Sequence, residues 1–147
     1  MADAKLVELV NKEIANLTVL YTKLHNYHWF VSGPRFFELH QKWEELYNEA
    51  TANLDELAER LLALGEKPVA TLREYLELAS IEEATGNETP EDMVRSVIND
   101  FEKISTELVE AIELADQADD QVTGDLLIGM KKSLNKHGWM LNAYLQK

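Results

Sequence analysis

Two histidines and three carboxylates in the first half of the chain have a spacing that suits metal binding. They are His28, His40, Glu44, Asp55 and Glu59. His40 is four residues before Glu44, and Asp55 is four residues before Glu59. Residues four apart stand on one face of a helix. A mixed set of imidazoles and carboxylates suits ferrous iron, zinc or manganese, and a small number of protein ligands leaves coordination positions open for reactants.

The length of a helix prevents one chain from completing this site. At about 100° per residue, Glu44, Asp55 and Glu59 all fall within roughly 100° of His40, on a face separate from the leucines of the same segment. However, His40 and Asp55 are about 22 Å apart along the axis, at about 1.5 Å per residue. If these groups bind one ion, the two histidines come from one chain and the distal carboxylates from another. A two-fold axis then gives two equivalent sites per dimer.

Each of these residues also has an ordinary structural explanation. A single carboxylate fits a solvated helix face in a chain with 27 acidic residues. His28 lies near the edge of an apolar arc, where a hydrogen-bonded core imidazole explains it as well as a ligand does. The Glu-x-x-His motif of di-iron sites inside a helical bundle occurs nowhere, and residues 122–147 contain only Asp125 as an acid. A di-iron site of that intra-bundle type is therefore excluded.

Glycine and proline divide the sequence into long helices. Helix-forming residues dominate and no stretch has sustained strand alternation. The predicted helices span residues 4–31, 36–64, 90–115 and 122–145, with a short extra helix within 71–83. Thr89 is the expected N-cap of the third, with Pro90 at its first position. This pattern predicts an all-α fold, a ferritin-like four-helix bundle with the extra helix in the crossover between helices two and three.

The composition argues against a nucleic-acid-binding protein. The formal net charge is −13, from 27 acidic and 14 basic side chains, which repels phosphate backbones and attracts cations. An acidic surface that simply maintains solubility is the plainer explanation. There is no cysteine, so any metal must be held by histidines and carboxylates. With no signal peptide or membrane span in view, we expect a single domain over residues 1–147 in the cytoplasm.

Several motifs in the chain resemble those of the Dps miniferritins. They are LHNYHWFVSG at residues 24–33, FFELH at 36–40, DELAER at 55–60, GEKP at 65–68 and KHGWML at 136–141. The similarity runs through most of the chain. It implies a hollow dodecamer of four-helix subunits that oxidises ferrous iron, with hydrogen peroxide, at ferroxidase centres between subunits. The ferric product would be stored inside as oxyhydroxide, which protects against oxidative damage.

The resemblance also implies roles for individual residues. By position, His28 and His40 are ligands from one subunit. Asp55 and Glu59 are ligands from its two-fold partner. Glu44 stands where the family commonly has Asp, and its longer side chain can still reach an ion or a bound water. Zinc and manganese are the expected competitors of iron.

Four further residues receive roles from the same resemblance. Trp29 is similar to the family tryptophan beside the centre, which supplies an electron and limits radical escape, although a lone aromatic residue also fits simple packing. Asp116, Asp120 and Asp125 are candidates for an acidic three-fold pore that draws ferrous ions inward. An acidic loop with a helix-capping role is the alternative for these three.

Two other functions remain open at this point. Some Dps proteins compact DNA through lysine-rich tails, with iron oxidation secondary. Here only Lys5 and Lys12 are basic before Lys23, so DNA binding is expected to be weak and sensitive to salt. A metal-free helical adaptor is the third reading.

Overall fold

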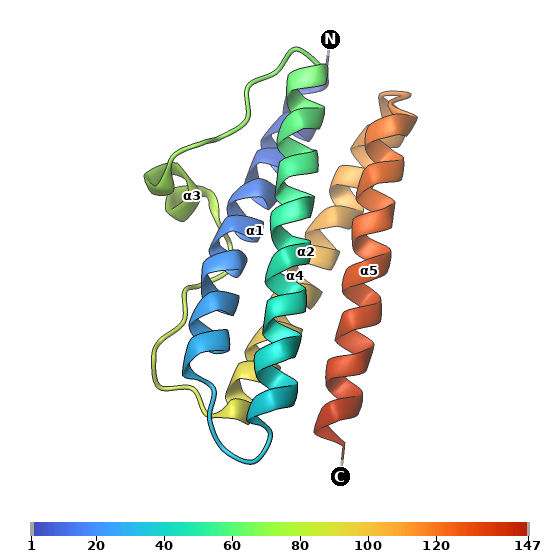
Figure 1. The fold of residues 1–147 in the computed structure, drawn as a ribbon. Helices are drawn as coiled ribbons and strands as arrows, with labels where there is room; N and C mark the ends of the chain where they lie inside the picture. The colour runs from blue at the N-terminus through green and yellow to red at the C-terminus, as the bar shows by residue number, and fades with distance from the viewer. Residues whose placement is uncertain (1, 147) are drawn as a thin grey trace.

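Five helices make up the protein in the computed structural model, which describes residues 2–146, and no strand occurs among those residues. The helices are α1 (Ala4–Phe30), α2 (Phe36–Ala63), α3 (Leu72–Leu78), α4 (Pro90–Gln117) and α5 (Gln121–Leu145). The four long helices form the bundle and α3 lies to one side of it (Figure 1). The predicted all-α bundle with an extra helix between its second and third long helices is confirmed.

The helix ends follow from their capping residues. Thr89 caps α4 as predicted: its hydroxyl accepts the Asp92 N–H at 3.1 Å, and the Asp92 carboxylate accepts the Thr89 N–H at 3.0 Å. After α2, Gly65 has a φ of +82°, and the Glu66 N–H donates to the Leu61 carbonyl. This is the left-handed termination that glycine makes without strain. After α4, Asp119 takes the same role with a φ of +55°.

The chain direction explains the long crossover. Short connections make α1 and α2 antiparallel neighbours, and likewise α4 and α5 (Figure 1). As a result α2 and α4 run the same way, and the segment between them must return along the whole bundle. It passes outside α1, where α3 packs (Figure 1).

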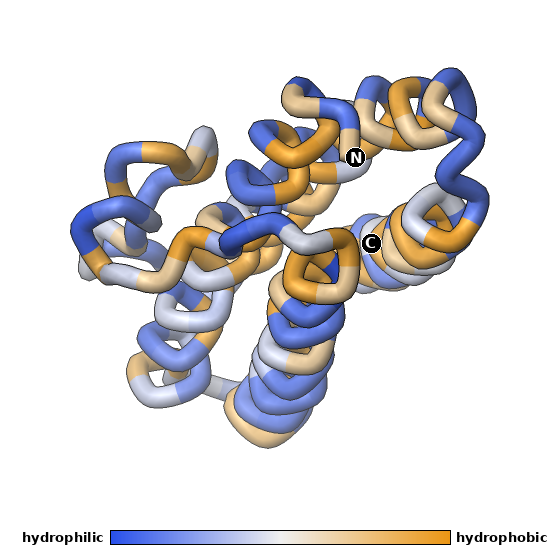
Figure 2. Tube along the Cα trace, turned by 90° about the horizontal axis from the view of Figure 1, so that it is seen from above, coloured by the Kyte–Doolittle hydropathy of each residue, from blue (hydrophilic) through white to orange (hydrophobic). Residues whose placement is uncertain are grey.

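The core consists of the apolar stripes of the four long helices. Hydrophobic stretches recur along each of them (Figure 2). Trp43 and Tyr27 are the largest fully buried side chains, with ring centroids 5.9 Å apart. In α2 the buried positions are Leu39, Trp43, Leu46, Ala50, Leu57 and Leu61. Burying this stripe leaves the opposite face of α2, which carries the candidate ligands, free for another contact.

The crossover helix is shorter than the span of 71–83 in which it was predicted. It ends at Leu78, and the backbone N–H groups of Ser80 and Ile81 donate to the side chain of Asn16 in α1 instead of continuing the helix. The Asn16 side chain, from a distant helix, therefore accepts hydrogen bonds from N–H groups that the local sequence pattern assigns to a further turn of α3.

Polar side chains join α2 to α5. His137, which is buried, lies 2.8 Å through Nε2 from the Glu49 carboxylate, and Ser133 also donates to Glu49. Nearer the other end, Arg60 pairs with Asp120 at 3.2 Å. His137 therefore has a structural role in the contact between α2 and α5. Among residues 2–146, no helix has the length and hydrophobicity needed to span a membrane.

Candidate metal centre

His28 and His40 face each other across the turn between α1 and α2. Their rings stack with centroids 3.6 Å apart and planes at 14°. His28 Nδ1 lies 2.6 Å from the carbonyl oxygen of His40, and His40 Nδ1 lies 2.7 Å from the carbonyl oxygen of His28. Because a carbonyl oxygen only accepts hydrogen bonds, each Nδ1 carries the proton of its ring. The lone pair of each Nε2 is therefore available to a metal ion.

Aromatic rings pack around this pair. Phe36 stacks on His40 with centroids 4.8 Å apart, and Tyr47 meets His28 edge-on at 5.4 Å and 89°. Tyr47 also stacks on His25 at 3.7 Å. Sequence reasoning did not identify Tyr47. Its position seven residues after His40, two helical turns along α2, was the signal that places it on the same face.

Glu44 lies on the open side of the histidine pair. Its Oε1 is 3.9 Å from His28 Nε2, and its side chain is exposed, whereas His28 is buried. The structure thus brings Glu44 and the two histidines together. Within residues 2–146 of a single chain, however, no group of three or more such residues is arranged to hold a metal ion.

Asp55 and Glu59 lie at the other end of α2. The helix is continuous from Phe36 to Ala63, and both carboxylates are exposed, while Leu57 between them is fully buried. The separation of about 22 Å from His40 therefore stands. One chain therefore does not bring these carboxylates to the histidines.

Trp29 points away from the core and its side chain is 66% exposed. Its ring centroid lies 5.3 Å from that of His25. His25 donates through Nδ1 to the Tyr21 carbonyl and stacks on Tyr47, which in turn touches His28. Trp29 is therefore connected to the histidine pair through two intervening rings.

The three candidate pore residues line one surface hollow at the junction of α4 and α5. Asp116 and Asp125 are exposed there. Asp120 differs, because it accepts hydrogen bonds from the Thr123 N–H and hydroxyl and pairs with Arg60. Burial raises the pKa of Asp120, but the hydrogen bonds from Thr123 and the Arg60 charge outweigh burial and lower it. The helix-capping alternative therefore describes Asp120.

Comparison with known proteins gives one consistent result. The ferritin-like domain family matches residues 7–147. General stress protein 20U of Bacillus subtilis is 56% identical over 96% of this chain and 97% of its own length. DNA protection during starvation protein 2 of Bacillus anthracis is 51% identical over 97% and 98%. The crystal structure of Dps from Staphylococcus aureus superposes with a TM-score of 0.96 at 49% identity, covering 100% of this chain and 99% of that one.

Proposed function

The chain belongs to the Dps family of ferritin-like proteins, and on that basis we propose that it is an iron-storage ferroxidase with active sites shared between two subunits. The observation that carries the proposal is the reciprocal hydrogen bonding of His28 and His40. It leaves both Nε2 atoms as ready ligands beside Glu44. An imidazole and carboxylate donor set suits ferrous iron, which is the substrate, and also suits zinc and manganese as competitors.

Each site takes its ligands from two chains. His28, His40 and Glu44 form one half. Asp55 and Glu59 of the partner subunit form the other half, because they are exposed and too distant within one chain. Packing two α2 helices antiparallel about a two-fold axis brings the halves together twice. The family places such pairs in a hollow dodecamer, which we propose for this chain in the cytoplasm.

The proposed reaction removes electrons in pairs. Two ferrous ions each lose one electron, and hydrogen peroxide takes both electrons with two protons to form two water molecules. Because the electrons arrive together, no hydroxyl radical is released. Carboxylates stabilise the ferric product through their charge, and hydrolysis then delivers ferric oxyhydroxide to the cavity.

Glu44 governs the second metal position in this scheme. Its oxygen is 3.9 Å from His28 Nε2, so the carboxylate stands at the edge from which an ion binds the ring. Compared with the Asp common in the family, the extra methylene group extends the reach of the carboxylate across the open side. It binds the second ion directly or through a water molecule.

Trp29 acts as the reserve electron donor. When only one ferrous ion is bound, peroxide still needs a second electron, and the indole supplies it through the rings of His25 and Tyr47. The exposed Trp29 ring lies next to His25, at the outer end of this series of rings.

Asp116 and Asp125 serve as the acidic lining of the pore through which ferrous ions reach the cavity. Both are exposed in the hollow between α4 and α5, so converging copies concentrate cations. Asp120 contributes less, because Arg60 offsets its charge.

Subunit complementation tests the shared site. One variant carries His28→Ala and His40→Ala, and the other carries Asp55→Asn and Glu59→Gln. Each assembled alone is expected to lose peroxide-driven oxidation of anaerobically bound ferrous iron. When the two variants are co-assembled in equal amounts, half of the dimers contain one chain of each. Each mixed dimer has one intact site out of two, so about a quarter of wild-type activity should return.

Size-exclusion chromatography must show that both variants keep the wild-type assembly. Mixing the two proteins after assembly, without subunit exchange, is the matched control and should recover nothing. Full activity in either variant alone would place the iron chemistry elsewhere. Inactive co-assembled protein would contradict the division of ligands between chains.

DNA compaction is the second candidate, because curated relatives carry the name DNA protection during starvation protein. The net charge of −13 opposes direct binding to phosphates, so we propose that DNA is protected by removal of iron and peroxide. A gel-shift assay at low salt without metal distinguishes the two. Retarded DNA that is released as salt rises would favour direct binding.

A further inference from the structure

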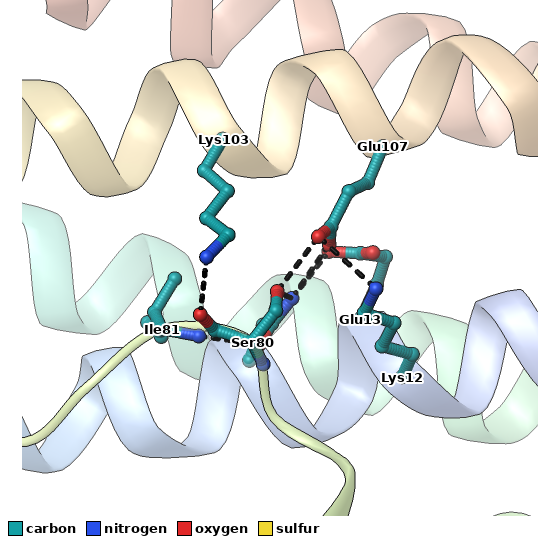
Figure 3. A network of polar contacts seen from close by, with 7 residues as sticks. Lys12, Glu13, Ser80, Ile81, Lys103 and Glu107 are labelled. Carbon is teal, nitrogen blue, oxygen red and sulfur yellow. Dashed lines mark hydrogen bonds and ion pairs between the residues drawn. The ribbon is translucent and has the colours of Figure 1, made fainter.

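A polar cluster is buried where the crossover passes over α1 and α4 (Figure 3). Asn16 of α1 is fully buried, and its Oδ1 accepts the N–H groups of Ser80 at 2.7 Å and Ile81 at 3.3 Å. Its amide nitrogen lies 3.0 Å from Glu13 Oε1 and 2.9 Å from Glu107 Oε1 of α4. Hydrogen bonds of Asn16 thus connect the crossover to α1 and α4. Its amide group also donates to the carboxyl groups of Glu13 and Glu107.

The cluster contains two carboxyl groups, and the ion pair with Lys12 neutralises the charge of one of them. Glu13 is 1% exposed. Glu107 accepts a hydrogen bond from the Ser80 hydroxyl at 2.7 Å and pairs with Lys12 at 3.1 Å. On the solvent side, Lys103 of α4 donates to the Ser80 carbonyl at 2.6 Å. Among the described residues Lys12 pairs with Glu107, so an ionised Glu13 would be a buried charge held by the neutral amide of Asn16 and not by a cation.

A proton on Glu13 resolves this conflict. Burial and the hydrogen bond with Glu107 raise the pKa of Glu13 to about 9. Burial also raises the pKa of Glu107, but hydrogen bonds from Glu13, Ser80 and Lys12 outweigh it and hold that pKa below its ordinary value. At neutral pH, Glu13 is therefore a carboxylic acid that donates to an ionised Glu107.

We propose that Glu13 and Glu107 form a proton-dependent latch that fastens the crossover to α1 and α4. With the proton in place, the two carboxyl groups share a hydrogen bond and present acceptors to Asn16 and Ser80. Without it, two carboxylates face each other in a buried site, and the strain is relieved by lifting the crossover so that water reaches Glu13. The charged groups around the pair are Lys12 from α1 and Lys103 from α4, and the crossover contributes the neutral Ser80.

Hydrogen exchange of the Ser80 and Ile81 amides in the full-length protein tests the latch. Wild type and Glu13→Gln are compared near pH 7 and at about pH 10, at matched pH, so that the intrinsic exchange rate cancels. Glutamine has the shape of the protonated acid and an N–H to donate. Because the open form returns Glu13 to its ordinary pKa of 4.5, Glu13→Gln should be at least as protected as wild type near pH 7. As pH rises from about 7 to about 9, protection in wild type should fall by up to tenfold per pH unit and then level off, and protection in Glu13→Gln should not change.

Two further measurements separate the latch from general loosening. Lys103→Ala removes the bond to the Ser80 carbonyl but not the titrating pair, so it should lower protection at both pH values and keep the wild-type pH dependence. In infrared spectra near pH 7, the difference between wild type and Glu13→Gln should contain the carbonyl stretch of one protonated carboxylic acid. Absence of that band, or equal pH dependence of protection in wild type and Glu13→Gln, would overturn the proposal.

Discussion

His28 and His40 each donate a ring N–H to the backbone carbonyl oxygen of the other, at 2.6 and 2.7 Å. The tautomer of each ring is therefore fixed by the backbone of its partner. Metal-binding histidines commonly have such an outer hydrogen bond, which orients the ring and raises its basicity. Here the two histidines provide this support for one another, and their hydrogen bonds connect the end of α1 to the start of α2.

This reciprocity predicts that the two histidines are not independent. His28→Ala and His40→Ala should each slow peroxide-driven iron oxidation by at least ~10-fold, since each removes a ligand and frees the other ring. The double variant should lose much less than the product of the single losses. Stopped-flow absorbance of the ferric product measures the rates, and His137→Gln, which removes a buried imidazole elsewhere, is the control. Multiplying losses would mean that the rings act separately.

Trp29 and Trp139 offer a matched pair, because both side chains are 66% exposed. If Trp29 supplies electrons to the iron site, Trp29→Phe should increase hydroxyl radical release several-fold during oxidation with substoichiometric iron. Trp139→Phe should not. Spin-trapping measures the radical, and ferric product formation should change little in either variant. Equal radical release from both variants would contradict a role of Trp29 as an electron donor.

Asp120 should stabilise the fold in a pH-dependent way. Its pKa in the folded protein lies below the ordinary value of 3.8, so its stabilisation is present above that pH and is lost as pH falls through the folded pKa. Asp120→Asn keeps a good N-cap but loses the Arg60 ion pair. We expect a loss of about 1 kcal/mol near pH 7 that disappears in strong acid. Denaturant unfolding at both pH values measures it, with Asp116→Asn as the control.

The pore assignment predicts a salt-dependent effect on uptake. Asp116→Asn with Asp125→Asn should slow the initial uptake of ferrous iron several-fold at low ionic strength, and less at high ionic strength. Glu8→Gln with Glu77→Gln removes the same charge from exposed positions outside the hollow. Equal slowing by both double variants would indicate a general effect of net charge and contradict a pore role.

Helix positions were predictable from sequence because their signals are local. The Thr89 cap, Pro90 and Gly65 each act within one turn, and the observed ends of the four long helices lie within two residues of the predicted ones. The Asp119 termination was not signalled, since aspartate rarely takes a positive φ. The end of α3 could not be predicted from the local sequence either, because it depends on Asn16, more than 60 residues away.

The candidate site was predictable only in part. Helical spacing placed Glu44 near His40 and showed that Asp55 lies too far away. The contact between His28 and His40 depends on the turn between α1 and α2, which spacing does not describe. The protonated Glu13 could not be predicted for a similar reason, since its raised pKa depends on burial and on Glu107 in a distant helix.

Under the proposed function, the separation of the histidines from Asp55 and Glu59 along one continuous α2 would make iron chemistry conditional on quaternary structure. An ion that requires ligands from both subunits binds more tightly to the dimer than to a single chain. By thermodynamic linkage, ion binding strengthens dimer formation by the same factor. A newly synthesised chain would then remain inert toward ferrous iron and peroxide until it finds its partner. Catalysis would begin only where the hollow oligomer that stores the ferric product is already forming.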